Sequence, residues 1–289
     1  MKISVRLMMV FIAVRLTSAT NTAQTQGGEI PGVMVAMGPE GLKGEKRVLA
    51  EGLASQEECD MMLDLAQTAV TTLDGGRLFA FTDYETYEGL TVLHAAMLAQ
   101  QGVVSVDSAD KFLTLSEKAR RFVHDYFGLQ QELFLDLTHL VCRTAVPAFA
   151  GGRPRTDPSH DVHVDNCELS SPGQDWYCKY QTLFNQRDYS AIMFLNDDFE
   201  GGEFFFADRN RTAQATVQPK CGRLVAFSSG PENPHGVQAV LQGRRCVLAM
   251  WYTLDKQHDE WPRYKAREIV DSLLKPEGDQ RNEKLENEL

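Results

Sequence analysis

The stretch YSAIMFLNDDFEGGEFFFA, residues 189–207, contains two short apolar runs separated by a cluster of Asn, Asp and Gly. Short runs rich in β-branched and aromatic residues, bounded by turn-forming residues, predict strands rather than helices. Further runs of this kind lie at 132–142, 223–228, 235–240 and 245–254. Because no helical pattern separates these runs, they predict an antiparallel sandwich or barrel rather than alternating strands and helices.

The segment ahead of residue 131 has helical periodicity instead. Ser55-Gln56-Glu57-Glu58 has the spacing of a capping box and predicts the start of a helix. Thr114 and Glu117 have the same spacing and predict a second helix, which Gly128 should end. A third helix is predicted at 91–101. The sequence therefore predicts an α+β fold with a mainly β core flanked by N-terminal helices.

The composition limits the classes of function. A chain of 289 residues, 43% of them hydrophobic, is long enough for one large core. A net charge of -11 and a pI near 5.1 argue against nucleic-acid binding, because that binding needs basic groups to neutralise phosphates. No segment approaches the roughly 20 apolar residues that a membrane helix needs, so we expect no transmembrane segment.

The two ends of the sequence resemble targeting signals. Residues 1–20 combine basic residues, an apolar run and small residues, as secretory signals do; a disordered or alternatively spliced N-terminus is the alternative. The final ENEL is a relaxed version of a retention address for the endoplasmic reticulum. We expect a signal and flexible linker over 1–45, a folded domain over 46–262 and a charged tail over 263–289.

Six cysteines occur without a Cys-x-x-Cys pair, so their spacing does not predict a structural zinc site. An even count fits an oxidising compartment. Cys167 and Cys178 flank a polar loop and are the pair that we expect to be bridged, with two separate thiols as the alternative. Asn210-Arg211-Thr212 is an N-glycosylation sequon, which matters if the chain enters the secretory pathway.

His163-Val164-Asp165 lies where the chain becomes extended after a Pro/Gly-rich loop. In an extended segment, residues two apart project from the same face, so the imidazole and the carboxylate should lie side by side. A hydrogen-bonded surface pair is the alternative interpretation. With one more histidine they would form a two-His-one-carboxylate triad, which holds Fe(II) by three positions and leaves three open.

His235 is the candidate for the third ligand, because it opens an apolar run directly after a turn. The other five histidines suit structural or supporting positions: His94, His124 and His139 in helical or strand-core patterns, His258 in the charged tail, and His160 in the Pro-rich loop. About seventy residues separate Asp165 from His235, a distance that several strands of a barrel can fold back.

Arg245 follows His235 by ten residues. Gln242-Gly243 predicts a chain reversal between them, which would put Arg245 on the next strand, pointing into the same barrel mouth. Arginine presents a planar fork that suits a carboxylate and stays charged when partly buried. A cosubstrate that chelates a metal at one end and carries a carboxylate at the other would be held by both groups, and 2-oxoglutarate has that shape.

Five segments, in order and with matching spacing, resemble the catalytic domain of the leprecan family, the collagen prolyl 3-hydroxylases. The segments are HVDNC (163–167), RDYSA (187–191), NDDFEGGEF (196–204), KCGRLVAFSSG (220–230) and ENPHGVQAV (232–240). The resemblance covers roughly residues 46 to 262. More broadly, the chain is similar to the iron and 2-oxoglutarate dioxygenases of the prolyl hydroxylase class.

The resemblance implies a double-stranded β-helix, or jelly roll, flanked by helices. It implies that His163, Asp165 and His235 bind Fe(II) and that Arg245 binds the distal carboxylate of 2-oxoglutarate. The expected reaction is 3-hydroxylation of proline in collagen-type Gly-Xaa-Hyp sequences, with release of succinate and carbon dioxide and with ascorbate keeping the iron reduced. The family also implies work in the endoplasmic reticulum, on procollagen chains, with chaperones or a prolyl isomerase as partners.

Two other functions fit the same residues. The first is the same chemistry on another target, such as a different prolyl position, a lysine or a small molecule. The second is a collagen-binding or chaperone module without catalysis, against which an intact triad with Arg245 argues. Formation of succinate that depends on iron would separate the enzymes from the module.

Overall fold

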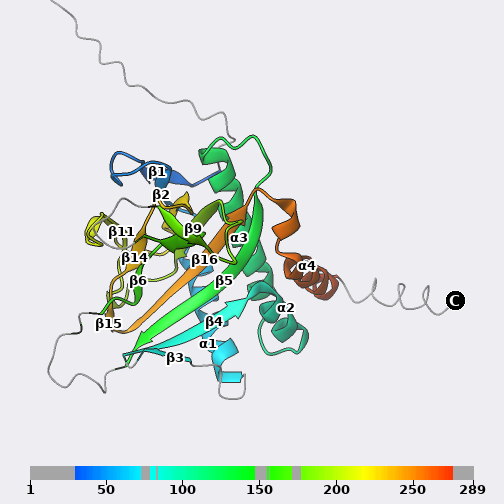
Figure 1. Cartoon of the computed structure of the whole chain (residues 1–289). Helices are drawn as coiled ribbons and strands as arrows, with labels where there is room; N and C mark the ends of the chain where they lie inside the picture. The colour runs from blue at the N-terminus through cyan, green and yellow to red at the C-terminus, as the bar shows by residue number, and fades with distance from the viewer. Residues whose placement is uncertain are drawn as a thin grey trace, which may run out of the picture.

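The structure, a computed structural model, describes residues 30–72, 79–82, 84–146, 155, 157–170 and 177–275. Its framework is an eight-stranded antiparallel sheet (Figure 1). In spatial order the strands are β1 (Met34–Met37), β2 (Arg47–Glu51), β13 (Leu224–Ser228), β9 (Tyr189–Phe194), β16 (Arg244–Thr253), β5 (Phe134–Ala145), β4 (Glu85–Thr91) and β3 (Phe79–Thr82).

A smaller, four-stranded sheet faces part of the first. Its spatial order is β12 (Ala213–Val217), β11 (Phe204–Ala207), β14 (His235–Val237) and β6 (His160–His163). Two short pairs complete the strands: β10 (Glu200–Gly201) with β15 (Val240–Gln242), and β7 (Cys167–Leu169) with β8 (Cys178–Gln181).

The chain alternates between the two main sheets. It runs from β5 in the large sheet to β6 in the small one, back to β9, across to β11 and β12, back to β13, across to β14, and finally back to β16. This winding is that of a double-stranded β-helix, so the expected fold is confirmed.

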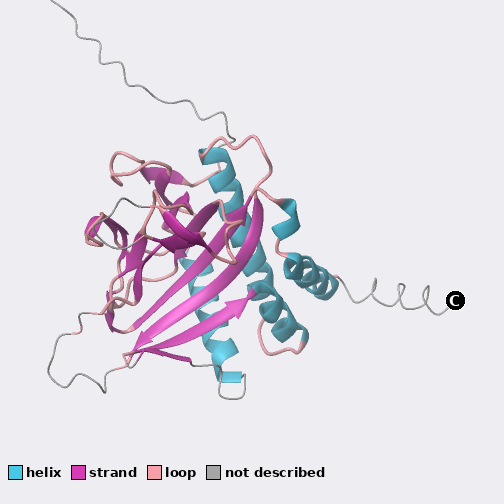
Figure 2. Cartoon of the chain, in the orientation of Figure 1, coloured by secondary structure: helices cyan, strands magenta, loops and turns pink. Residues whose placement is uncertain are grey.

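The two faces of the large sheet bury different partners because side chains alternate along a strand. On β16, Cys246, Leu248 and Met250 belong to the core shared with the helices. Val247, from the opposite face, belongs to the core shared with the small sheet, which includes Phe204. Figure 2 shows the helices gathered on one side of the strands. Arg245 has the parity of Val247 and therefore faces the space between the sheets.

The helices are α1 (Gln56–Thr72), α2 (Val92–Gln100), α3 (Val106–Tyr126) and α4 (Trp261–Leu274), with a short 3-10 turn at Lys256–His258. The capping box of α1 is confirmed: the Glu58 N–H donates to the Ser55 hydroxyl (3.2 Å), and the Ser55 N–H to the Glu58 carboxylate (2.9 Å). The helix predicted at 91–101 is confirmed as α2.

The predicted start of α3 was wrong. Ser105 is the N-cap, and its hydroxyl accepts from the Ser108 N–H at 3.0 Å. Thr114 and Glu117 lie inside the helix instead, where Glu117 pairs with Arg120. The end near Gly128 is confirmed, since α3 ends at Tyr126 and Gly128 has a φ of 62°, which a residue without a side chain adopts easily.

Folded structure extends beyond both expected boundaries. Strand β1 lies within the expected linker, and Leu42 is buried there. Helix α4 occupies most of 263–275, which the sequence assigned to a charged tail, and three of its residues are buried: Ala266, Ile269 and Val270. The apolar face of α4 was overlooked because charged residues surround it. The expected leader and the ENEL ending lie outside the described residues.

All six cysteines are bridged. The expected Cys167–Cys178 bridge is confirmed and joins β7 to β8. Cys142–Cys246 joins β5 to β16 at directly opposed positions, and the third bridge is Cys59–Cys221. None of the helices in the described ranges is both long and apolar enough to cross a bilayer.

His139 occupies a structural position on β5, where its Nδ1 lies 3.3 Å from the Tyr87 hydroxyl. Burial, followed by the nearby His94, lowers the pKa of His139 to about 4. Because the unfolded chain binds the proton more readily, the free energy of unfolding should fall as the pH drops from about 6.5 to 4. Allowing for the partial exposure of the ring, we expect the free energy of unfolding to fall by roughly 1–2 kcal/mol over this pH range.

Urea unfolding at pH 7 and at pH 5 measures this effect. His139→Gln should reduce the difference in unfolding free energy between the two pH values, whereas the same change at His258, which lies in the exposed 3-10 turn, should not. Equal pH dependence in wild type and His139→Gln would contradict the prediction.

Candidate metal centre

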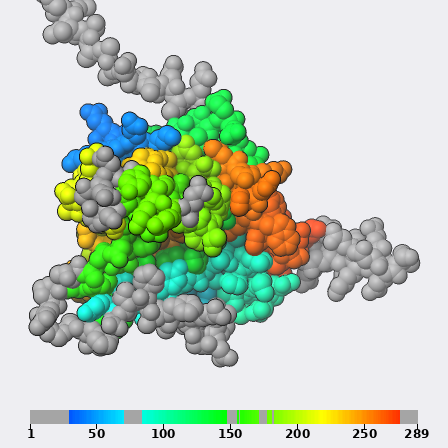
Figure 3. Space-filling model, in the orientation of Figure 1, coloured from blue at the N-terminus to red at the C-terminus, as the bar shows by residue number. Residues whose placement is uncertain are grey.

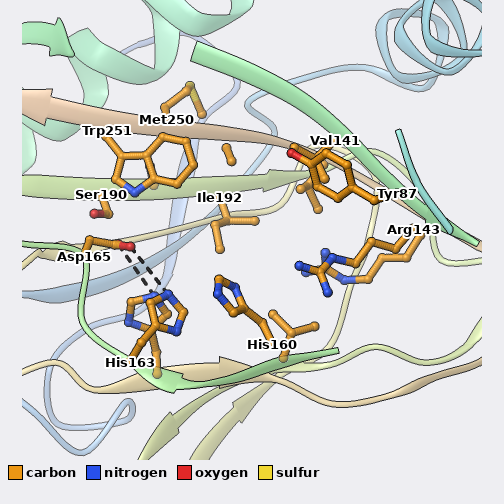
Figure 4. Close-up of a pocket in the computed structure, with 16 residues that line it drawn as sticks. Tyr87, Val141, Arg143, His160, His163, Asp165, Ser190, Ile192, Met250 and Trp251 are labelled. Carbon is orange, nitrogen blue, oxygen red and sulfur yellow. Dashed lines mark ion pairs between the residues drawn. The ribbon is translucent and has the colours of Figure 1, made fainter. Parts of the chain in front are cut away.

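Three side chains from two neighbouring strands meet between the sheets. His163 is the last residue of β6 and His235 the first of β14, and the two are directly opposed. Asp165 follows β6 by two residues. Its carboxylate oxygens lie 3.6 Å from Nε2 of His163 and 3.6 Å from Nε2 of His235 (Figure 4). The three potential ligand atoms all lie within 4.8 Å of one another.

The backbone fixes the orientation of both imidazoles. Nδ1 of His163 lies 2.7 Å from the Asp161 carbonyl oxygen, and Nδ1 of His235 lies 2.9 Å from that of Asn233. A carbonyl oxygen only accepts, so each Nδ1 carries the proton and donates it. Each Nε2 is thereby left with its lone pair facing Asp165, which is the arrangement of a histidine that binds a metal.

The surroundings of Asp165 and His235 favour the protonation states that a metal needs; burial would lower the pKa of His163 as well, but the neighbouring Asp165 raises it. Burial would raise the pKa of Asp165, but His235 and His163 beside it hold that pKa well below its usual value. Burial lowers the pKa of His235 to about 4, with the nearby His163 contributing. At neutral pH the carboxylate is therefore ionised and His235 is neutral, as metal ligands must be.

Arg245 lines the same cavity, which has a volume of about 270 Å³. Its side chain is 4% exposed, and its Nε donates to the Gly202 carbonyl at 2.7 Å. Its Nη2 has no hydrogen-bond partner among the described residues. Burial, and then the nearby Arg143, lower the pKa of Arg245 to about 9, so it is charged at neutral pH. A buried cation with an unused donor suits a carboxylate ligand.

Comparison with known proteins supports this interpretation. Residues 155–253 match the model of the 2OG-Fe(II) oxygenase superfamily. The chain is 43% identical over 258 residues to prolyl 3-hydroxylase 1 of Gallus gallus, a match that covers 87% of this chain and 35% of the relative. It is 43% identical over 234 residues to prolyl 3-hydroxylase 2 of Homo sapiens, covering 80% and 33%.

The chain contains a domain of the 2OG-Fe(II) oxygenase superfamily, at residues 155–253. It spans about a third of the length of the prolyl 3-hydroxylases that it matches. Among solved structures, a prolyl-4-hydroxylase of Pseudomonas putida aligns with a TM-score of 0.43 and 17% identity, over 74% of this chain and 95% of that chain.

The cavity fits the iron and 2-oxoglutarate that the name of the superfamily implies. The donor set of two imidazoles and one carboxylate is the one used by non-haem Fe(II) oxygenases, and it leaves positions open for further ligands. The unpartnered Nη2 of Arg245 is a donor that the second carboxylate of 2-oxoglutarate would fit. The four residues predicted from the sequence are thus brought to one cavity.

His160 lines this oxygenase cavity without joining the triad. Its ring stacks on that of His163, with the centroids 3.9 Å apart. This position agrees with the supporting role expected for it. Asn233, whose carbonyl orients His235, is itself held by Arg47, whose Nε donates to the Asn233 side-chain oxygen at 2.6 Å.

The route from His235 to Arg245 differs from the predicted reversal. The apolar run at 235–240 is divided into β14 and the start of β15, and β15 pairs with β10. After Gly243, which has a φ of 84°, the chain enters β16 in the large sheet. Arg245 does lie on the next strand and does line the cavity, but the strands on either side of Gln242-Gly243 do not pair with each other.

Tyr87, Arg143 and Trp251 are among the cavity residues that sequence reasoning missed. Arg143 and Trp251 share the parity of Val141 and Val247 on β5 and β16, so their place on the inner face follows from strand alternation once the core face is known. An arginine at the end of an apolar run was the available signal. No sequence signal identified Tyr87 as a cavity residue, because the sequence pattern did not predict β4 as a strand.

Proposed function

We propose that this chain is an Fe(II)- and 2-oxoglutarate-dependent dioxygenase that 3-hydroxylates proline in collagen-type Gly-Xaa-Hyp sequences. The observation that carries the proposal is the meeting of His163, Asp165 and His235 with the unpartnered donor of Arg245 in one cavity. The 43% identity to prolyl 3-hydroxylase 1 of Gallus gallus supports the choice of prolyl substrates and of the ring position.

The chain's residues divide the work between the two ends of the cosubstrate. His163, Asp165 and His235 hold the metal, and Arg245 holds the far carboxylate through charge-assisted hydrogen bonds. Bound Fe(II), with 2-oxoglutarate and dioxygen, supplies the oxidising power to break a carbon–hydrogen bond of the proline ring, and 2-oxoglutarate leaves as succinate and carbon dioxide.

An aromatic side chain near the triad, that of Trp251, supports an apolar ring as the substrate. Figure 4 shows Trp251 on the same side of the cavity as Asp165 and Ser190. The guanidinium of Arg187 lies 4.5 Å from the centre of the Trp251 ring and is paired with Asp136 at 2.9 Å. The indole is thereby held in place, and a proline ring can pack against it.

The remaining parts of the proposal concern the setting of the reaction. Three disulfides among the described residues support work in an oxidising, secretory compartment, which we propose to be the endoplasmic reticulum. Ascorbate would restore iron that becomes oxidised without hydroxylation. Assembly with chaperones or a prolyl isomerase stays a prediction, as does glycosylation of Asn210, which is exposed in the turn between β11 and β12.

Incubation of purified protein with Fe(II), 2-oxoglutarate, ascorbate and a Gly-Pro-Hyp repeat peptide tests the proposal. We expect succinate to form with one oxygen atom gained per modified peptide site, and fragmentation to place it on carbon 3 of proline. A peptide with alanine in place of that proline should remain unmodified. Succinate without peptide oxidation would indicate another substrate, and binding of the peptide without succinate would indicate the non-catalytic module.

A further inference from the structure

A second guanidinium faces the cavity, beside that of Arg245 on the neighbouring strand. Arg143 on β5 and Arg245 on β16 are partners in the strand register, and both line the cavity. The Cβ atoms of two residues paired in this way are about 4.5–5.5 Å apart. Like charges on such a pair destabilise the sheet. A negative charge in the space that both side chains face would therefore stabilise the pair.

A buried carboxylate sets the position of Arg143. Glu85 is 0% exposed, and its Oε2 lies 3.5 Å from Nη1 of Arg143. The same carboxylate also pairs with Arg155 at 2.6 Å and accepts from the backbone N–H of Val240 at 3.0 Å. A single buried carboxylate is thus shared between two arginines. Arg143 is further fixed by donating to the Ser159 carbonyl.

The guanidinium of Arg143 points into the cavity rather than away from it. Figure 4 shows its nitrogens directed towards the space between Tyr87 and His160. Arg143 is 7% exposed and Arg245 is 4% exposed, so water screens neither charge well. Nη2 of Arg245 meanwhile has no partner in the described part of the chain. Two poorly hydrated guanidinium groups at one end of a cavity form a binding site for a carboxylate, an anion with two oxygens.

We propose that Arg143 is a second binding residue for the distal carboxylate of 2-oxoglutarate, so that two neighbouring strands, β5 and β16, hold it. This inference rests on the proposed function, because it assigns the far end of the same cosubstrate. Glu85 acts as a positioning residue that holds Arg143 in place. The triad then binds the keto-acid end, and the two arginines select cosubstrates that carry a second carboxylate.

Calorimetric titration of 2-oxoglutarate into the full-length protein tests this without turnover. The protein is loaded with Mn(II) and kept under nitrogen. Loss of one charged partner in a buried site should raise the Kd for Arg143→Gln on the order of 10- to 100-fold. Arg143→Lys keeps the charge beside Glu85 but loses the fork, so a smaller increase is expected.

Arg244→Gln is the matched control. Arg244 is next to Arg245 on β16, has the opposite parity and pairs with Glu88 outside the cavity lining. Its Kd for 2-oxoglutarate should equal that of wild type. A second ligand, 2-oxovalerate, has the same keto-acid end and chain length but no distal carboxylate. Its affinity should be the same for wild type, Arg143→Lys and Arg143→Gln.

The outcomes separate the inference from the proposed function. If wild type binds 2-oxoglutarate and both Arg143 variants bind it equally well, the role of Arg143 is overturned while the proposed function stands. Equal weakening towards 2-oxoglutarate and 2-oxovalerate would also overturn it, since that indicates general damage to the cavity. If wild type binds no 2-oxoglutarate, the proposed function falls and the inference falls with it. Should Arg143→Gln not fold, as judged by circular dichroism, Arg143→Lys carries the test.

Discussion

Replacing Asp165 by alanine is expected to abolish hydroxylation, with a loss of at least about a thousandfold in succinate formation. Asp165 is the only carboxylate of the triad and lies 3.6 Å from the Nε2 atoms of both histidines. Without it, two neutral imidazoles must hold a divalent cation with no compensating charge. Metal affinity should therefore fall together with turnover.

Succinate formation and calorimetric titration with Mn(II) measure the two effects separately. Removal of a buried charge should leave the fold intact, so the circular dichroism spectrum should match that of wild type. Asp197→Ala serves as the matched control, because this aspartate is exposed in the turn after β9. Hydroxylation by Asp165→Ala at a rate near that of wild type would defeat the assignment of the triad.

Replacing Arg245 by glutamine is expected to raise the KM for 2-oxoglutarate roughly 100-fold, while Mn(II) affinity stays within about twofold. The guanidinium is buried and charged, and its Nη2 is available to a ligand. Glutamine keeps a polar side chain near the Gly202 carbonyl but removes the charge. The binding energy of the distal carboxylate is lost, whereas the ligands of the metal are untouched.

Initial rates over a range of 2-oxoglutarate concentrations provide the measurement, with Arg244→Gln as the control variant. A Lys substitution at 245 should lie between wild type and glutamine, since it retains charge without the planar fork. An unchanged dependence on 2-oxoglutarate would contradict this role for Arg245, even if the triad assignment held.

Local signals in the sequence were sufficient for some features of the fold and of the site. The capping box at Ser55 and the pairing of His163 with Asp165 depend on spacings of two or three residues, which the chain shows directly. His235 and Arg245 lie far from Asp165 along the chain. Elimination of the other histidines and the predicted turn at Gln242-Gly243 made them candidates, and the resemblance to a known family supported their convergence, because spacing alone does not specify which strands become neighbours.

Features that depend on long-range packing were not predictable in the same way. Thr114 and Glu117 have capping spacing, but the buried face of α3 begins near Ser108, so the helix extends back to a cap at Ser105. Arg143 became a candidate only once the register of β5 with β16 was known. The apolar residues of α4 contribute to the core through contacts with α2 and α3, which the composition of a charged segment conceals.

The bridge between Cys142 and Cys246 has a practical consequence for handling the protein. Both sulfurs are fully enclosed, and their neighbours in the sequence are Arg143 and Arg245. Thiol reagents added to assay buffers can reach this bridge only when the core between the sheet and the helices opens, so the bridge should survive them in the folded protein. Protein refolded from inclusion bodies needs an oxidant such as glutathione disulfide, because otherwise the two strands that present the guanidinium pair would lack their covalent tie.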